Sequence, residues 1–118
     1  MSVIEYGYVY AIGLDGEVKL GVSATDASRR LKVMQTGNCR NLQLIAQAYV
    51  ANYKLLEKAL HREHKDKWIR GEWYSLSLAE AREIISGVGE DLVARETNRM
   101  MMEQESIKRF LINRGGVV

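Results

Sequence analysis

Proline is absent from this sequence of 118 residues, and cysteine and phenylalanine occur once each. The lone Cys39 cannot form an internal disulfide and gives no reason to expect an oxidising compartment. No apolar run approaches the roughly 20 residues that cross a bilayer, and the start of the chain lacks the basic and apolar segments of a secretion signal. We therefore expect a cytoplasmic protein with no membrane partner, whose helices and strands no proline interrupts.

The composition is that of an ordinary soluble globular protein, with 47% hydrophobic and 27% charged residues. A chain of this length can bury one core but not two. The net charge of +2 is too small to indicate a nucleic-acid partner by itself, but the charge is unevenly distributed. Between residues 27 and 70, ten cations and three anions leave a net charge of +7, and the flanks are acidic. A phosphate backbone favours such a segment, although a solvated lysine-rich surface explains it equally well.

Two neighbouring segments near the N-terminus alternate in side-chain character with a period of two. Residues 7–12 and 17–22 both show this period, which predicts β-strands. The Asp15-Gly16 pair between them is typical of the turn of a β-hairpin. We expect the hairpin to bring Tyr10 and Lys19 close together across the two strands.

Helical spacing and capping residues predict the remaining elements. We expect helices over residues 27–35, 51–65, 77–85 and 90–113, a third strand over 41–50 and an extended piece over 68–76. Ser77 and Glu80 form a capping box at the start of the third helix. The fold class is therefore α+β: a small antiparallel sheet, made from the N-terminal hairpin and the central strand, is flanked by helices and followed by a trailing C-terminal helix.

Short motifs in the first part of the chain resemble those of the GIY-YIG nuclease superfamily, in the same order. They are Tyr8-Val9-Tyr10, Lys19-Leu20-Gly21, Arg30-Leu31, Glu57 with His61, and Gly71-Glu72-Trp73-Tyr74. The last two look like the branch common in phage and mobile-element proteins, which tolerates lysine for the second tyrosine, as at Lys19. The resemblance implies a GIY-YIG-like nuclease domain over residues 1–86 and a C-terminal helical extension over 87–118.

The resemblance also implies an activity, namely metal-dependent hydrolysis of phosphodiester bonds in DNA with Mg²⁺ or Mn²⁺. Tyr10 would be the general base, and because a free phenol has a pKa near ~10, neighbouring positive charge must lower that pKa. Lys19 would supply this charge, although an ammonium cannot copy the hydrogen bonding of the phenol that it replaces. Arg30 would stabilise the charge on the phosphoryl oxygens, and His61 would orient water or contact phosphate. The alternative for Tyr10 is a simple role in cross-strand packing.

Glu57 is the expected metal ligand. It follows Leu56 on a helix whose apolar stripe is Tyr53, Leu56 and Leu60, so about 100° of rotation per residue puts it beside the stripe and not opposite it. Mg²⁺ often takes only one or two carboxylates and keeps several waters, so Glu57 alone would suffice. The alternative is an exposed carboxylate that pairs with a neighbouring lysine.

A zinc site is a weaker alternative for the same helix. It would use Glu57, His61 and His64 with Cys39, but the chain lacks the paired-ligand spacing of structural zinc sites.

Further residues suit nucleic-acid binding or the core. Arg29, Lys32 and Arg40 are candidates for holding flanking phosphates, with solvated surface positions as the alternative. We expect core positions for Trp68, Trp73 and Tyr74 and structural roles for Tyr6 and Tyr8, which share a face with Tyr10.

The trailing helix over residues 90–113 carries more apolar surface than one helix can hide, with Met100-Met101-Met102 extending beyond one face. It packs on the core or forms a homodimer. The sequence shows no zinc finger or helix-turn-helix, so a protein partner would supply the target. The competing functions are a nuclease-like fold that binds nucleic acid or protein without cutting, and a small dimeric accessory protein.

Overall fold

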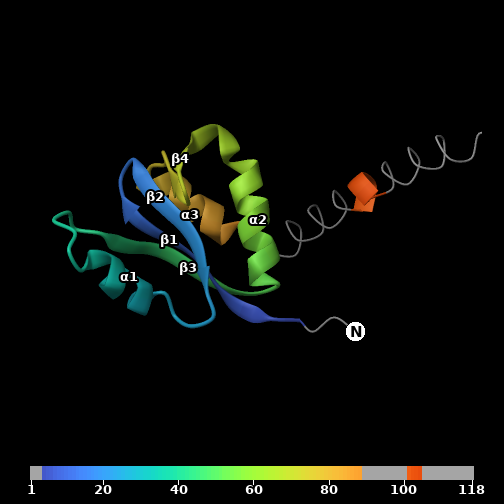
Figure 1. Ribbon diagram of the computed structural model, residues 1–118, viewed down its shortest axis with the longest axis horizontal. Helices are drawn as coiled ribbons and strands as arrows, with labels where there is room; N and C mark the ends of the chain where they lie inside the picture. The colour runs from blue at the N-terminus through green and yellow to red at the C-terminus, as the bar shows by residue number, and fades with distance from the viewer. Residues whose placement is uncertain (1–3, 89–100, 105–118) are drawn as a thin grey trace, which may run out of the picture.

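A five-stranded antiparallel sheet organises the part of the chain that the computed structural model describes, residues 4–88 and 101–104 (Figure 1). The strand order is β3-β1-β2-β5-β4. The strands are β1 (Tyr6–Leu14), β2 (Glu17–Ser23), β3 (Gln43–Ala51), β4 (Trp68–Arg70) and β5 (Trp73–Tyr74). The helices are α1 (Ser28–Gln35), α2 (Tyr53–Glu63) and α3 (Leu78–Ser86), with a 3₁₀ turn, η1 (Lys65–Lys67), between α2 and β4. The α+β class is confirmed.

The predicted hairpin is the centre of the sheet. Strands β1 and β2 pair antiparallel up to Leu14 and Glu17, so Asp15 and Gly16 form a two-residue turn. Gly16 has a φ of +91°, a conformation that glycine adopts without strain. The turn is also tied to the start of α3, because the Asp15 carboxylate accepts a hydrogen bond from the Leu78 amide at 3.1 Å. A strong local turn signal and a tertiary contact therefore hold the hairpin together.

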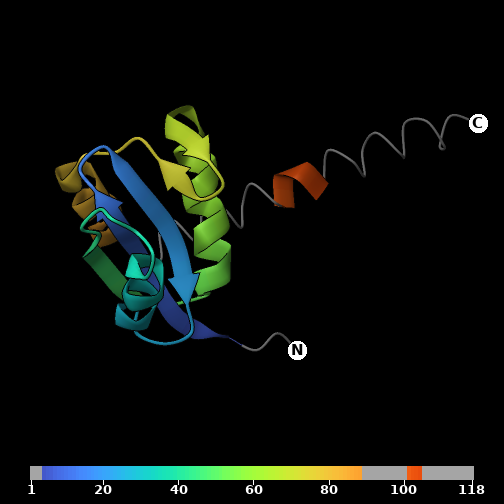
Figure 2. The ribbon, with the colours of Figure 1, turned by 60° about the vertical axis from the view of Figure 1, so that its left-hand side comes forward.

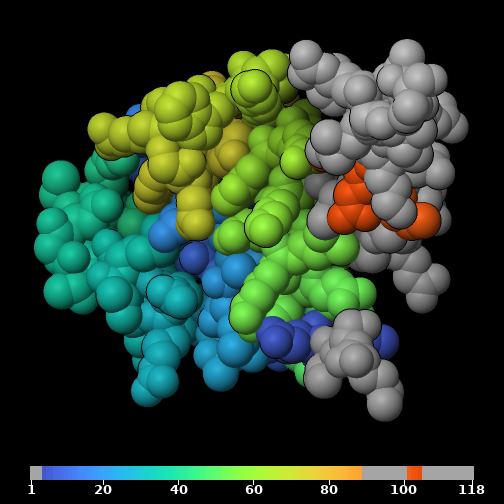
Figure 3. Space-filling model, turned by 45° about the vertical axis from the view of Figure 1, so that its right-hand side comes forward, coloured from blue at the N-terminus to red at the C-terminus, as the bar shows by residue number. Residues whose placement is uncertain are grey.

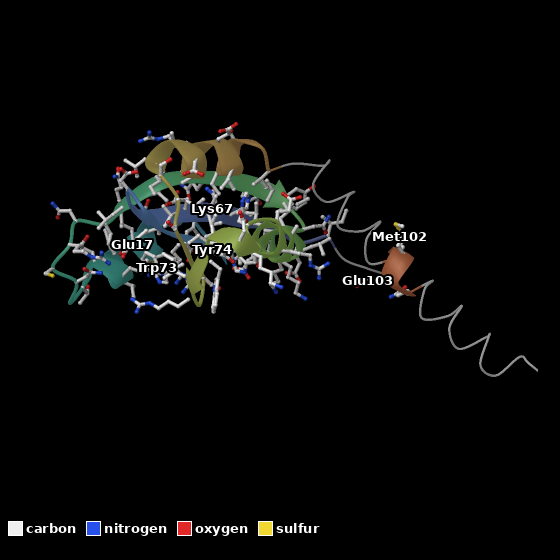
Figure 4. All side chains as sticks on the ribbon, turned by 90° about the horizontal axis from the view of Figure 1, so that it is seen from above. Glu17, Lys67, Trp73, Tyr74, Met102 and Glu103 are labelled. Atoms are coloured by element: carbon white, nitrogen blue, oxygen red, sulfur yellow. The ribbon has the colours of Figure 1, made fainter. Side chains whose placement is uncertain are left out.

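Helices cover the two faces of the sheet unequally (Figures 2 and 4). On one face, α2 and α3 pack on the larger core cluster, which includes Val9, Ala11 and Leu20. On the other face, α1 covers a smaller cluster that includes Tyr10 and Ile12. Successive residues of a strand point to opposite faces, so β1 contributes to both clusters.

Helix α2 is seated directly on β1. Its buried residues are Tyr53, Leu56, Ala59 and Leu60, which include the predicted apolar stripe. A Cβ atom at Gly7 would lie 2.7 Å from the Tyr53 ring, so only glycine permits this close approach. This contact fixes where α2 lies along β1, and it therefore also fixes the position of Glu57 on that helix.

Within residues 4–88, the predicted elements appear within a few residues of their expected bounds, with one change. The extended piece over residues 68–76 is a second, short hairpin made of β4 and β5. The expected core position of Trp68 is wrong, because this side chain lies on the edge strand β4 and is 56% exposed. The capping box of α3 is confirmed, with Ser77 and Glu80 each accepting a hydrogen bond from the other's amide.

Most of the predicted C-terminal helix, over residues 90–113, lies outside the described residues. Residues 101–104 are helical, and the Glu103 carboxylate lies 3.9 Å from the Arg62 guanidinium. The predicted homodimer and the boundary between residues 1–86 and 87–118 stay predictions. Within the ranges that the structure describes, no helix is long and apolar enough to cross a membrane.

Candidate functional site

The phenol of Tyr10 is buried at the centre of the site. Tyr10 is 2% exposed and pairs with Gly21 across the hairpin. A Cβ atom at position 21 would lie 2.6 Å from the Tyr10 Oη, so the ring occupies space that only glycine leaves open. Tyr10 and Lys19 lie near one another across the hairpin, as expected, although the residue that pairs with Lys19 is Ile12. The two-residue turn sets this register, and Lys19 becomes a diagonal neighbour of Tyr10 on the same face.

Lys19 forms an ion pair with Glu72. Its Nζ lies 3.7 Å from Oε2 of Glu72, which precedes β5, and its backbone pairs with Trp73. The Leu20 amide also donates a hydrogen bond to the Glu72 carbonyl at 3.0 Å, which holds this residue beside β2. The short β4–β5 hairpin therefore brings a carboxylate to the site.

His61 reaches the site from α2 and is oriented by the backbone. Its Nε2 lies 2.9 Å from the carbonyl oxygen of Leu20. A carbonyl can only accept, so Nε2 donates, and a neutral ring then has its lone pair on Nδ1. The ring also packs against Tyr74, with 5.5 Å between ring centroids. The orientation of His61 is thus set on two sides.

Glu57, His61 and Glu72 form the candidate metal site. One potential ligand atom from each lies within 4.8 Å of the others, and all three side chains are half-buried. Burial raises the pKa of Glu57, and the charge of Glu72 raises it further, while His61 and Lys19 oppose this shift. Two carboxylates and an imidazole suit a divalent cation such as Mg²⁺ or Mn²⁺, and a cation there would offset the repulsion between the carboxylates.

The four residues of the alternative zinc site do not lie together in the structure. Cys39 is exposed in the segment after α1. His64 lines a separate cavity of about 410 Å³ between α2 and α3. Neither belongs to the cluster of Glu57, His61 and Glu72.

Arg30 approaches the site from α1. With Ser23, Ala24, Thr25, Arg29 and Val33 it lines a cavity of about 340 Å³. Its charge lowers the pKa of Tyr10, but burial is the larger effect and raises that pKa, as do the charges of Glu72 and Glu57. The net shift is upward, so the expected lowering of the Tyr10 pKa by Lys19 does not occur. The phenol therefore holds its proton at neutral pH.

The structure thus brings Tyr10, Lys19, Arg30, Glu57 and His61 to one region around β2. In Figure 3, α1, β2 and α2 lie next to one another on the side of the molecule that is shown. The three residues expected to hold flanking phosphates do not lie together. Arg29 lines the same cavity as Arg30, and Lys32 is exposed on α1. Arg40 instead pairs with Glu17 at the other end of β2.

Glu72 is the residue that sequence reasoning missed. It lies within the Gly71-Glu72-Trp73-Tyr74 motif, and the sequence alone gives its carboxylate no role. The signal in the sequence is a carboxylate directly after a glycine, because glycine permits a turn that can hold the next side chain against a neighbouring strand. In the structure, Gly71 has a φ of +52°.

Comparisons with known proteins give a family. A family model described as the T5orf172 domain matches residues 7–89, which contain every residue of the candidate site. A search of curated proteins and a search of solved structures found no match. Because the family model covers more than half of the 118 residues, the chain belongs to the T5orf172 domain family.

Proposed function

We propose that this protein is a metal-dependent endonuclease that hydrolyses phosphodiester bonds in DNA. Its family is a phage-associated domain of the endonuclease type, which supports a nuclease-like or DNA-binding module. The observation that carries the proposal is the grouping of Glu57, His61 and Glu72 within 4.8 Å, together with the electrostatic contact of Glu57 and Glu72 with Tyr10.

Glu57, His61 and Glu72 would hold Mg²⁺ or Mn²⁺. When bound, the ion supplies Lewis-acid chemistry, which neutralises charge on the phosphoryl oxygens and makes bound water more acidic. His61 would use Nδ1, because its Nε2 donates to the Leu20 carbonyl. Glu57 and Glu72 would each offer a carboxylate oxygen.

Tyr10 is the proposed proton acceptor for the attacking water. The charges of Glu72 and Glu57 raise its pKa, so the phenol stays protonated while both carboxylates are uncompensated. Pairing these carboxylates with a cation would remove the two electrostatic causes of the raised Tyr10 pKa and leave burial, the largest cause, opposed by the charge of Arg30. Tyr10 can accept a proton from water only as the phenolate, so the phenol would first have to lose its own proton to solvent, and a cation paired with Glu57 and Glu72 would favour that loss.

Arg30 would meet the charge that develops on the phosphoryl oxygens, because its planar guanidinium can donate two hydrogen bonds. Arg29 lines the same cavity and would contact a neighbouring phosphate. Lys19 would maintain the position of Glu72 through their ion pair and add positive charge beside the scissile phosphate.

A second function is a nuclease-like module that binds DNA without cutting it. The ion pair between Lys19 and Glu72 favours this function, because it already neutralises part of the charge that would attract a cation. The raised pKa of Tyr10 favours it too.

Nicking of supercoiled plasmid distinguishes the two functions. The nuclease should nick with Mg²⁺ or Mn²⁺, stop with EDTA and lose activity in Glu57→Gln. Salt-sensitive retention of the same plasmid without nicking, under all these conditions, would instead support the binding module.

A further inference from the structure

Tyr10 is one member of a row of tyrosines that continues along the sheet. Tyr8 and Tyr6 share its face of β1, and Tyr49 of β3 pairs directly with Tyr8. The rings of Tyr6 and Tyr49 are stacked, with centroids 5.8 Å apart and an interplanar angle of 20°. Tyr8 and Tyr49 are tilted, with centroids 5.0 Å apart.

Two of these rings are open to solvent. Tyr6 is 55% exposed and Tyr49 is 61% exposed, whereas Tyr10 on the same face is buried. The difference arises because α1 covers this face only from the Tyr10 level onward, where the Ala27 amide donates to the Gln47 side chain at 2.9 Å. Among the described elements, none packs over the part that carries Tyr6, Tyr8 and Tyr49.

The exposed rings are continuous with the cationic cavity. Tyr8 pairs on its other side with Ser23 of β2, and Ser23 lines the cavity with Arg29 and Arg30. The exposed aromatic rings therefore lie beside the guanidinium groups of α1, and the Tyr10 phenol lies on the same face of the sheet. Proteins bind single-stranded nucleic acid with these two features, a positively charged groove and aromatic rings beside it.

We propose that Tyr6, Tyr8 and Tyr49 form a stacking platform for unpaired bases, so that the substrate is DNA with a single-stranded segment next to the cleaved bond. This inference rests on the proposed function and specifies its substrate class. Arg29 and Arg30 hold the phosphates of the strand while its bases lie on the rings. The bases inside a duplex are already stacked on one another and cannot occupy the platform. A tyrosine ring stacks on any base, so the platform selects strand state and not sequence.

Binding, measured apart from cleavage, tests the platform. The protein is the full chain carrying Glu57→Gln, kept in EDTA, and the probes are a blunt duplex and the same duplex with a single-stranded tail. Fluorescence anisotropy should show that the tailed DNA binds more tightly than the blunt DNA. Adding Tyr49→Ala should weaken binding to the tailed DNA by about tenfold, the order expected for one lost stack, and leave the blunt DNA unaffected.

Tyr49→Phe is the matched control, because it keeps the ring and removes only the hydroxyl. It should bind tailed DNA like the parent. A 2-aminopurine base in the tail should be quenched by the parent and by Tyr49→Phe but not by Tyr49→Ala, a signature that a purely structural role would not produce. Circular dichroism and melting curves show whether each variant is folded, and Tyr6→Ala provides a second ring deletion should Tyr49→Ala fail to fold.

Equal binding of blunt and tailed DNA, or equal quenching by Tyr49→Ala and Tyr49→Phe, would overturn the platform. A change in sedimentation with Tyr49→Ala, without a change in DNA binding, would overturn it too and mark the face as an interface between two copies of the chain. A different result would overturn the nuclease proposal. Quenching of the tail by a wild-type protein that never nicks DNA would remove the nuclease and leave the platform.

Discussion

The phenol oxygen of Tyr10 lies over the Cα atom of Gly21, at a position where a Cβ atom would come within 2.6 Å of it. Real Cβ atoms essentially never approach a heavy atom so closely, and Tyr10 is buried between the sheet and α1. The glycine that ends the second short motif is therefore required for the tyrosine of the first motif to occupy its place.

Substituting Gly21→Ala should displace the Tyr10 ring. Because overpacking of a well-filled core costs about 1–3 kcal/mol, we expect urea denaturation to show a loss of unfolding free energy of that order. Nicking should fall further than the loss of folded protein accounts for, since the proton acceptor moves. Gly87→Ala is the control, because a Cβ atom there would meet its neighbours at 3.4 Å or more. A Gly21→Ala protein as stable and active as the control would contradict the close packing.

Substituting Glu57→Gln should abolish metal-dependent nicking and raise stability slightly at neutral pH. The folded-state pKa of Glu57 is raised, so its charged form is less stable in the fold than in the unfolded chain. The gain in unfolding free energy from the neutral amide should be complete at a pH above the pKa of Glu57 in the folded protein. It should disappear below the pKa of Glu57 in the unfolded chain, near 4.5. Denaturation at pH 7 and pH 3 measures this difference. Glu83→Gln on α3 is the control, and unchanged nicking by Glu57→Gln would remove this carboxylate from the mechanism.

Much of the fold could be predicted because its signals are local. Alternation in β1 and β2, the Asp15-Gly16 turn and the Ser77–Glu80 capping box all lie within a few residues of where they act. A two-residue turn at positions 15 and 16 places Gly21, not Lys19, opposite Tyr10.

The remaining differences are tertiary. Strands β4 and β5 have three and two residues, too few to show a period, so sequence reasoning could not place Glu72 beside Glu57. The exposure of Trp68 depends on which strand lies at the edge of the sheet, and that of Tyr49 depends also on where α1 begins to cover its face. No local pattern contains that information.

Removing the Lys67 ammonium should destabilise the fold in a pH-dependent manner. Hydrogen bonds from Lys67 and from the Ser77 amide lower the pKa of Glu80 from 4.5 to about 2. A lowered folded-state pKa adds stability that is complete above the unfolded value and is lost as the pH falls from about 4.5 to about 2. Lys67→Met should therefore lower the melting temperature at pH 7 but have little effect at pH 2. Ser77→Ala should cost about 1 kcal/mol as a lost helix cap. An equal effect of Lys67→Met at both pH values would show that the ion pair contributes nothing.

Substituting Lys19→Met should move the acidic limb of the nicking profile to higher pH. The charge of Lys19 opposes the raised pKa of Glu57, so without it that carboxylate should take up a proton at a higher pH. A protonated Glu57 binds a divalent cation poorly, and more Mg²⁺ should then be required at pH 6 than at pH 8. Lys19→Arg should keep the wild-type limb, because it keeps the positive charge. Arg40→Met, which breaks an ion pair at the far end of β2, is the control for a general loss of positive charge. If Lys19→Met lowers nicking equally at every pH, the lysine acts by contacting the phosphate and not through Glu57.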